Sequence, residues 1–159
     1  MVRKTKNIQF YEAIGRRKEA VARVRLYLVT NKEKKVALKH ILIGKEALTI
    51  KQGETFVNKK PMATYFPSLV DQARFLVPLK LTNNEDRFAI SIVTAGGGKN
   101  GQIEAIIHGL SRAIEKVDKD QYRITLKKAG LLTRDPRVRE RRHVGTGGKS
   151  RRQKQSPKR

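Results

Sequence analysis

The chain has 159 residues, of which 38% are hydrophobic and 32% are charged, so it has room for one domain with a real core and not comfortably for two. Lysine and arginine number 37 against 14 aspartate and glutamate, a formal net charge of +23 that predicts a polyanionic partner. Nucleic acid is the first candidate and an anionic membrane surface the second. The absence of cysteine excludes disulfides and thiolate metal sites and fits a reducing compartment.

Membrane and targeting signals are not evident. No apolar run approaches the roughly 18 residues of a membrane span, and no helix pairs a basic face with a bulky apolar one. The basic start MVRKTK is not followed by an apolar segment, so no secretory signal is expected, and no transit peptide is obvious. The sequence therefore predicts an intracellular, cytoplasmic protein that makes no membrane contact.

Strands are predicted where apolar and polar side chains alternate. Residues 20–27 place four apolar side chains on one face and Arg23 and Arg25 on the other, the pattern of a half-buried strand. Residues 55–57 and 87–93 are predicted as further strands.

Two regions are harder to place. Residues 30–52 are lysine-rich with scattered aliphatic side chains, and we expect them to form an extra hairpin. Residues 68–76 follow a proline and are predicted as a short helix with Leu69, Val70 and Ala73 turned inward.

The clearest helix is predicted over residues 101–117. Seven apolar side chains recur at helical spacing and form one wide stripe: Ile103, Ile106, Ile107, Leu110, Ala113, Ile114 and Val117. His108 and Arg112 fall on the polar side. A second helix, over about 119–129, is expected to end at Gly130, a natural residue for the first position beyond a helix.

Charge concentrates at the C-terminal end. Residues 129–159 contain 11 lysine and arginine against 2 aspartate and glutamate, so 31 residues carry +9 of the total charge. From position 133 onward only Val138 and Val144 are apolar. Such a segment cannot offset its ordering entropy by burial. The sequence predicts a globular domain over 1–132 and an extended basic tail over 133–159 that is disordered without RNA.

The tail contains GTGGKS at 145–150, which resembles the end of a phosphate-binding loop. The full motif requires a glycine five residues before Gly148, where this chain has His143, and it requires a preceding strand and a following helix. Neither is predicted, so an NTPase is not expected. We interpret the glycines as a slim, flexible stretch of backbone beside cations that can neutralise phosphates.

A second glycine pattern precedes the clearest helix. Gly96, Gly98 and Gly101 satisfy G-x-G-x-x-G, but Asp118 and Asp120, at the distance of the expected ribose ligand, lie between two helices rather than after a strand. The favoured interpretation is a tight turn onto the helix. Alternatively, backbone N–H groups at the start of the helix hold an RNA phosphate.

No pattern suggests catalysis. The three histidines lie far apart in the sequence and no carboxylates cluster beside them, so a metal site is not expected. The run GRRKEAVARVR is either the solvated face of a strand or a phosphate contact. Three consecutive cations, Arg16, Arg17 and Lys18, favour phosphate contact modestly.

Five ordered segments resemble the ribosomal small-subunit protein number 9 family of the universal, bacterial type: YEAIGRRKEAVARVRL, FVNKKPMATYFP, AGGGKNGQIEAIIHGLSRAI, LKKAGLLTRDPRVRERR and the terminal Lys-Arg. The resemblance covers essentially the whole chain apart from residues 30–52, which we interpret as an insertion. It implies an α+β fold with a four-stranded sheet and helices on one face, similar to the second domain of ribosomal protein S-five. It also implies a tail threaded through rRNA in the head of the small subunit.

The resemblance further implies that the tip of the tail, Lys158 and Arg159, contacts the tRNA in the P site, and that other proteins of the subunit head are neighbours. We expect basic and glycine residues of the domain and the tail to bind rRNA: Arg16, Arg17, Lys18, Gly97, Gly98, Lys99, Arg134, Arg137, Arg139, Arg141, Arg142, Lys149, Arg151, Arg152 and Lys154. No cofactor and no small-molecule substrate are expected.

Two departures from the family pattern bear on these contacts. The family commonly ends Gln-Phe-Ser-Lys-Arg, whereas this chain has Gln155, Ser156 and Pro157 before the final pair, so a stacking aromatic is missing. Ile107 replaces an arginine that usually precedes His-Gly. The expected function is nonetheless that of a structural rRNA-binding component without catalysis. The rivals are a DNA-architectural protein and, third, an enzyme with a glycine-rich nucleotide site.

Overall fold

A computed structural model describes residues 3–5, 8–28, 35–43, 46–144 and 148 of the chain. The main sheet has the order β1-β2-β3-β8-β6-β7, with β1 (Arg3–Thr5), β2 (Ile8–Arg17), β3 (Ala20–Leu28), β8 (Phe88–Ala95), β6 (Thr55–Val57) and β7 (Lys60–Pro61). A separate hairpin contains β4 (Lys35–Ile43) and β5 (Glu46–Lys51). The helices are α1 (Met62–Tyr65), α2 (Leu69–Leu81), α3 (Lys99–Val117) and α4 (Lys119–Lys128).

The expected α+β class is confirmed, but the four-stranded sheet is wrong, because six strands pair in the described part of the chain. The two additional strands are short segments at the sheet edges. At one edge β1 pairs antiparallel with the start of β2. At the other edge β7 folds back on β6 through Asn58 and Lys59, whose φ angles of 46° and 69° are those of a tight hairpin turn. Hairpin returns of two or three residues leave too little alternation to be visible in the sequence.

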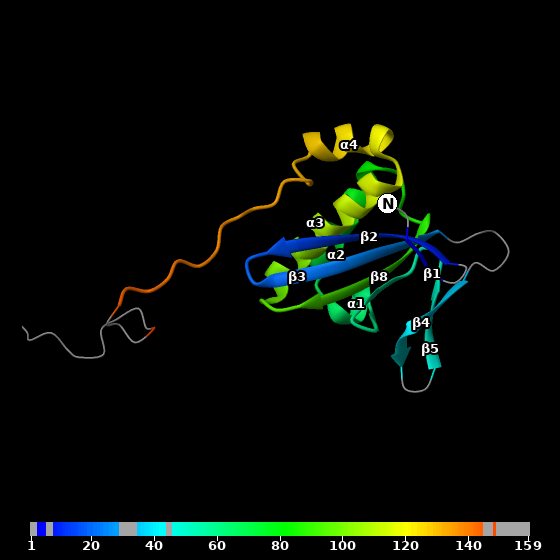
Figure 1. Cartoon of the computed structure of the whole chain (residues 1–159), viewed down its shortest axis with the longest axis horizontal. Helices are drawn as coiled ribbons and strands as arrows, with labels where there is room; N and C mark the ends of the chain where they lie inside the picture. The colour runs from blue at the N-terminus through cyan, green and yellow to red at the C-terminus, as the bar shows by residue number, and fades with distance from the viewer. Residues whose placement is uncertain (1–2, 6–7, 29–34, 44–45, 145–147, 149–159) are drawn as a thin grey trace, which may run out of the picture.

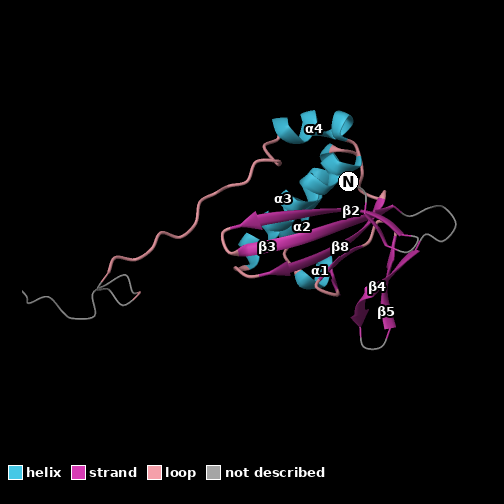
Figure 2. Cartoon of the chain, viewed as in Figure 1, coloured by secondary structure: helices cyan, strands magenta, loops and turns pink. Residues whose placement is uncertain are grey.

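The helices lie together on one side of the sheet, and α3 runs across β2 and β3 (Figures 1 and 2). The alternation predicted for β3 is confirmed: Ala20, Ala22, Val24 and Leu26 are fully buried against this side. On α3 the predicted apolar stripe supplies the opposing surface, with Ile103, Ile106, Leu110, Ala113 and Ile114 fully buried. The core thus forms between one sheet face and one helix stripe.

The prediction for α2 was wrong in length and in orientation. The helix continues through Pro78 to Leu81, and the Thr82 hydroxyl donates hydrogen bonds to the carbonyls of Pro78 and Leu79. The buried residues are Phe75, Pro78 and Leu79. Leu69 and Val70, expected to face inward, are 80% and 68% exposed, and Ala73 is exposed as well. The helix is apolar on both sides, so its sequence alone does not specify which side packs on the core.

The expected hairpin within residues 30–52 is present as β4 and β5, which pair antiparallel. The hairpin meets the main sheet where β5 packs near β8, and the Ile50 side chain on β5 is fully buried. Phe10 and Tyr27, which are register partners on β2 and β3, are also buried, and their ring centroids lie 5.7 Å apart. These side chains belong to the sheet face opposite the helices, so one end of that face has a small apolar cluster of its own.

Two glycines bring α3 into close contact with β2. A Cβ atom on Gly15 would lie 2.0 Å from the carbonyl oxygen of Ala105 and 2.3 Å from the backbone nitrogen of Gly109. A Cβ on Gly109 would in turn lie 3.0 Å from both the Gly15 nitrogen and the Val24 side chain. The strand and the helix therefore meet backbone to backbone, which places the side chains on either side of Gly109 beside the outer edge of β2.

The C-terminal part of the domain follows the prediction closely. α4 begins at the Asp118 cap, whose side chain accepts from the Gln121 N–H, and it ends before Gly130, which has a φ of 71°. Residues 133–143 form neither helix nor strand and run away from the domain (Figure 1).

Candidate nucleic-acid interface

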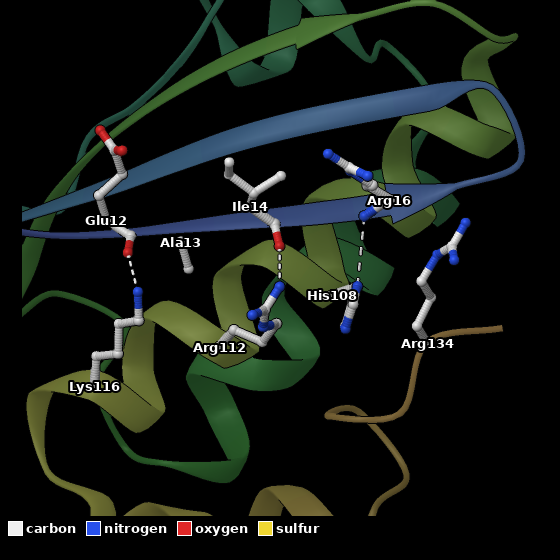
Figure 3. Close-up of a pocket in the computed structure, with 8 residues that line it drawn as sticks. All are labelled: Glu12, Ala13, Ile14, Arg16, His108, Arg112, Lys116 and Arg134. Carbon is white, nitrogen blue, oxygen red and sulfur yellow. Dashed lines mark hydrogen bonds between the residues drawn. The ribbon is translucent and has the colours of Figure 1, made fainter. Parts of the chain in front are cut away.

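The outer edge of β2 is capped by side chains from α3. β1 covers this edge only up to Phe10. Beyond it, the Lys116 Nζ donates to the Glu12 carbonyl at 2.6 Å and the Arg112 Nη1 donates to the Ile14 carbonyl at 2.5 Å. The Arg16 backbone N–H points at the His108 Nδ1 at 3.5 Å, a long contact (Figure 3). The edge is therefore closed to strand pairing by cationic and imidazole groups.

The match between helix and strand has a simple geometric basis. His108, Arg112 and Lys116 are four residues apart, so they lie on one line along α3 at intervals of about 6 Å. Glu12, Ile14 and Arg16 are two residues apart on β2, so their outward backbone groups recur at about 6.7 Å. Three consecutive contacts form because these two repeats are nearly equal and the elements run in opposite directions.

A groove of about 500 Å3 lies along this contact (Figure 3). It is lined by Glu12, Ala13, Ile14, Arg16, His108, Arg112, Lys116 and Arg134. The Glu12 carboxylate is bound to Arg25 at 2.6 Å. Within the described part of the chain, none of the four cations of the groove is in an ion pair.

The cations of the groove keep hydrogen-bonding capacity. Arg112 and Lys116 each give one donor to a β2 carbonyl, and a guanidinium has five donors and an ammonium three. Arg16 and Arg134 are exposed at the rim. Converging donors of this kind are suited to the oxygens of a phosphate. The groove can therefore hold a phosphodiester backbone at the sheet edge.

His108 is half-buried between β2 and the start of the tail. Burial lowers the pKa of His108, and the positive charges of Arg112 and then Arg134 lower it further, against the raising effect of a hydrogen bond to the backbone of Leu132. The neutral imidazole is the form that can accept the Arg16 N–H. Glu104 lies one helical turn before His108 but is bound by Arg17 and Arg74.

We expect the domain to lose stability as the pH falls below about 6.5, the ordinary pKa of histidine. Because the pKa of His108 is lowered in the folded chain, the unfolded chain binds more protons in this range. The contribution of neutral His108 to the free energy of unfolding is therefore complete only above about pH 6.5. His108→Asn keeps an acceptor for the Arg16 N–H but does not titrate, so its melting temperature should fall less between pH 7.5 and 5.5. The control is His143→Asn, at an exposed site. Equal pH dependence of all three proteins would contradict the assignment.

Arg17, expected to bind rRNA, is engaged within the protein. Its side chain is 12% exposed; its Nε lies 2.5 Å from the Glu104 carboxylate and its Nη2 3.0 Å from the Asp135 carboxylate. Its Nη1 also donates to the Arg137 carbonyl at 2.9 Å. Hydrogen bonds from Arg137 hold the pKa of Asp135 well below its usual range, and the Arg17 charge adds to this. Arg17 thus attaches the first residues of the tail to the end of β2.

The glycine turn before α3 packs on the β2–β3 turn. Gly96 and Gly97 have φ angles of 73° and 63°. A Cβ on Gly96 would lie 2.5 Å from the Glu19 carbonyl oxygen. This close packing supports the tight-turn interpretation. Gly98 caps α3 without a side-chain bond and has open space around it, and Lys99 is exposed.

The structure places those residues of the domain that were expected to bind rRNA at one end of the sheet. Arg16 and Lys18 lie at the end of β2 and in the turn after it, and the glycine turn packs on that same turn. In the tail Arg139, Arg141 and Arg142 are exposed and line a shallow surface together with Glu19. The expected tail contacts from position 149 onward lie outside the described residues: Lys149, Arg151, Arg152, Lys154, Lys158 and Arg159.

The sequence interpretation missed Arg112 and Lys116 as groove residues. Their spacing of four and eight residues from His108 was a visible signal, but only the pairing of α3 with β2 shows that this line faces a strand edge. Among the described residues no cluster of three or more histidine and acidic side chains could hold a metal ion. No helix of the described chain is both long and apolar enough to cross a membrane.

The fold and the groove define a class of protein: a basic α+β domain whose cations converge at a sheet edge beside an outgoing basic segment. A family model described as ribosomal protein S9/S16 matches residues 15–159, and the chain belongs to this family.

Three relatives with names match the sequence of this chain over most of their own length. The small ribosomal subunit protein uS9 of Maridesulfovibrio salexigens is 41% identical over 139 residues, which cover 87% of this chain and 89% of the relative. The uS9 protein of Solidesulfovibrio magneticus is 40% identical over 88% of this chain and 90% of its own. That of Rickettsia rickettsii is 39% identical over 89% and 75%.

Proposed function

We propose that this chain is a structural constituent of the small ribosomal subunit that binds rRNA in the subunit head and extends its C-terminal tail to the P-site tRNA. It acts in the cytoplasm, on the ribosome, and has no catalysis of its own. Membership of the ribosomal protein S9/S16 family and the names of the relatives support the ribosomal role. The domain is proposed to share the architecture of the second domain of ribosomal protein S-five.

The observation that carries rRNA binding is the groove at the β2 edge. Arg16, Arg112, Lys116 and Arg134 converge there without an acidic partner among the described residues, and the chain continues from Arg134 into the basic tail. Cations in this arrangement replace counterions condensed on folded RNA, and the released ions supply the binding free energy. The rigid domain gives the contact its shape, which is how structured RNA is recognised.

The tail is proposed to order on RNA. Its composition leaves too little apolar surface to fold alone, and its first residues are oriented by the contacts of Arg17 with Asp135 and Arg137. Folding on binding allows a segment of this kind to follow the RNA surface far from the domain. Arg17 then acts chiefly by directing the tail, while the exposed cations that follow bind phosphates.

Direct binding to RNA and DNA tests this function against the rival of a DNA-architectural protein. We expect the full chain to bind a fragment of the head domain of small-subunit rRNA more tightly than duplex DNA of equal length at 0.2 M salt. The affinity for rRNA should fall by about a factor of 1,000 between 50 and 200 mM salt. The measurement is filter binding over a salt series. A preference for the DNA duplex at all salt concentrations would overturn the proposal.

Deletion of Lys158 and Arg159 should affect tRNA more than assembly. Nine of the eleven basic residues of the tail remain for rRNA, so incorporation into the subunit should persist. Loss of two charge-assisted phosphate contacts should weaken P-site tRNA binding by about 1–3 kcal/mol at low salt, and less at high salt. The measurement is tRNA binding to programmed small subunits that carry each variant.

The matched control replaces Arg151 and Arg152 by alanine, which should impair incorporation more than tRNA affinity. If instead the deletion of the last two residues blocked incorporation and left tRNA affinity unchanged, the tip would be an ordinary rRNA ligand.

A further inference from the structure

One of the two acidic residues of the tail lies between two arginines. The Asp135 carboxylate is 3.0 Å from the Arg17 Nη2 and 2.6 Å from the Arg137 Nη2, and it also accepts the Arg137 backbone N–H at 2.9 Å. The other acidic residue, Glu140, is exposed. In a segment of 11 basic and 2 acidic residues, the charge of a carboxylate works against the attraction to RNA. The contacts of Asp135 give it a different role.

Arg17 is a fixed partner for this carboxylate. It ends β2, its side chain is 12% exposed, and its Nε lies 2.5 Å from the Glu104 carboxylate on α3. The second oxygen of Glu104 lies 3.4 Å from the Arg74 Nη2 on α2. An isolated surface ion pair restricts its partners little. Here three elements of the domain hold the guanidinium in place, so its contacts with the tail fix the tail as well.

The contacts of Arg17 hold the backbone on both sides of a proline. Arg17 binds the Asp135 side chain and, through Nη1 at 2.9 Å, the Arg137 carbonyl. Between them Pro136 fixes its own φ angle and confines Asp135 to extended backbone. Before this point Leu132 packs against the core. The chain is therefore directed as far as Arg137, and the exposed cations beyond it leave the domain from one orientation (Figure 1).

We propose that Asp135 is a positioning residue that strengthens the binding of rRNA, although its charge opposes that binding. A segment that orders on RNA loses conformational entropy, and it loses less when its first residues are already held in one direction. Asp135 acts through Arg17, so both side chains are needed together. The effect on rRNA rests on the proposed function, whereas the fixed exit of the tail rests on these contacts alone.

Charge alone predicts the opposite result. If an RNA phosphate displaced Asp135 from Arg17, the free carboxylate would be repelled by RNA, and its removal would tighten binding. Asp135→Asn and Glu140→Gln add the same charge to the tail, and Asp135→Asn also breaks the ion pair with Arg17. Comparing them distinguishes the effect of tail position on affinity from the effect of charge. Arg17→Lys keeps the charge but lacks the planar fork that binds several oxygens at once.

Distances between two spin labels measure the exit of the tail in the free, full-length chain. The sequence has no cysteine, so Ile124→Cys on α4 and Val138→Cys in the tail provide the only labelling sites and change no charge. These positions are 63% and 64% exposed. We expect a narrow distance distribution in the labelled parent chain and in Glu140→Gln. The distribution should be clearly broader in Asp135→Asn and in Arg17→Lys.

Filter binding to a fragment of the head domain of small-subunit rRNA gives the affinity of the same variants. Asp135→Asn and Arg17→Lys should each weaken binding about fivefold, which corresponds to the ordering of about one more residue. The double variant should bind no more weakly than either single variant. Glu140→Gln should bind as tightly as the parent chain or more tightly. The melting temperature of Asp135→Asn should equal that of the parent chain, because Asp135 lies outside the core.

Unchanged or tighter binding of rRNA by Asp135→Asn would overturn the proposal, and so would an unchanged distance distribution in that variant. Additive losses of affinity in the double variant would also overturn it, because Asp135 would then act independently of Arg17. A parent chain that did not bind the rRNA fragment, while Asp135→Asn still broadened the distance distribution, would count against the ribosomal function and not against the positioning of the tail.

Discussion

Gly15→Ala is expected to destabilise the domain by about 3 kcal/mol, the upper end of what added volume costs in a packed interior. The new Cβ would lie 2.0 Å from the Ala105 carbonyl oxygen and 2.3 Å from the Gly109 nitrogen, and both are backbone atoms that cannot rotate away. α3 would have to move off β2. The free energy of unfolding, measured by urea denaturation, tests this.

The matched control is Gly101→Ala, in the first turn of α3. A Cβ there would meet only ordinary contacts, 3.6 Å from the Ala20 Cβ and 3.7 Å from the Arg17 carbonyl oxygen, and alanine favours a helix interior over glycine by up to about 1 kcal/mol. This variant should be neutral or stabilised. If Gly15→Ala unfolded at the same urea concentration as the wild type, the close approach of β2 and α3 would not hold.

Displacement of α3 would also disturb the groove. Arg112 and Lys116 reach the Ile14 and Glu12 carbonyls only while the glycine contact keeps the helix against the strand. In subunits that still incorporate a Gly15→Ala chain, we therefore expect weaker rRNA affinity as well as lower stability.

Truncation of the chain after Arg137 is expected to lower its affinity for small-subunit rRNA by about 100-fold or more at 0.1 M salt. The deletion removes nine of the eleven basic residues of the tail and leaves the Asp135 and Arg137 contacts with Arg17 in place. Each lost phosphate contact should reduce the slope of log affinity against log salt by about 0.7–0.9. Filter binding over 50–300 mM salt measures both quantities.

Two controls distinguish the effect of the lost charge on rRNA affinity from an effect on folding and from an effect of the residue order in the tail. The melting temperature of the truncated chain should match that of the whole protein, because the deleted residues begin beyond the contacts of Arg17. A full-length chain with residues 138–159 in scrambled order keeps the charge and should recover most of the affinity if counterion release dominates. A truncated chain that bound rRNA as tightly as the wild type at every salt concentration would place the RNA contacts in the domain alone.

Several elements were predictable from the sequence because their signals are local. The alternation in β3 and the apolar stripe of α3 each record which side of an element is buried, and both agree with the structure. Gly130 ended α4 as expected, since glycine adopts a left-handed φ at little cost. The basic composition and the five family segments likewise indicated the family that the comparisons show.

The orientation of α2 and the sheet edges were not predictable in this way. α2 has apolar residues on both of its sides, so periodicity cannot say whether Leu69 or Phe75 faces the core. β2 has apolar residues on both faces, with Tyr11 and Ala13 toward the helices and Phe10 on the opposite face near the hairpin. Beyond Phe10 the strand does alternate buried and exposed positions, but Ile14 is an exposed aliphatic residue and hides the alternation, so β2 was not predicted.

Composition and local periodicity by themselves determined a basic chain with one α+β core and a charged C-terminal segment, because burial and charge repeat within a few neighbouring residues. Only the tertiary structure decided how the cations are used. Arg112 reaches a β2 carbonyl 98 residues away and Arg17 binds Asp135, which is 118 positions further along the chain. Such pairings depend on which elements pack together, in particular on the meeting of Gly15 with Gly109, and no local pattern encodes that contact.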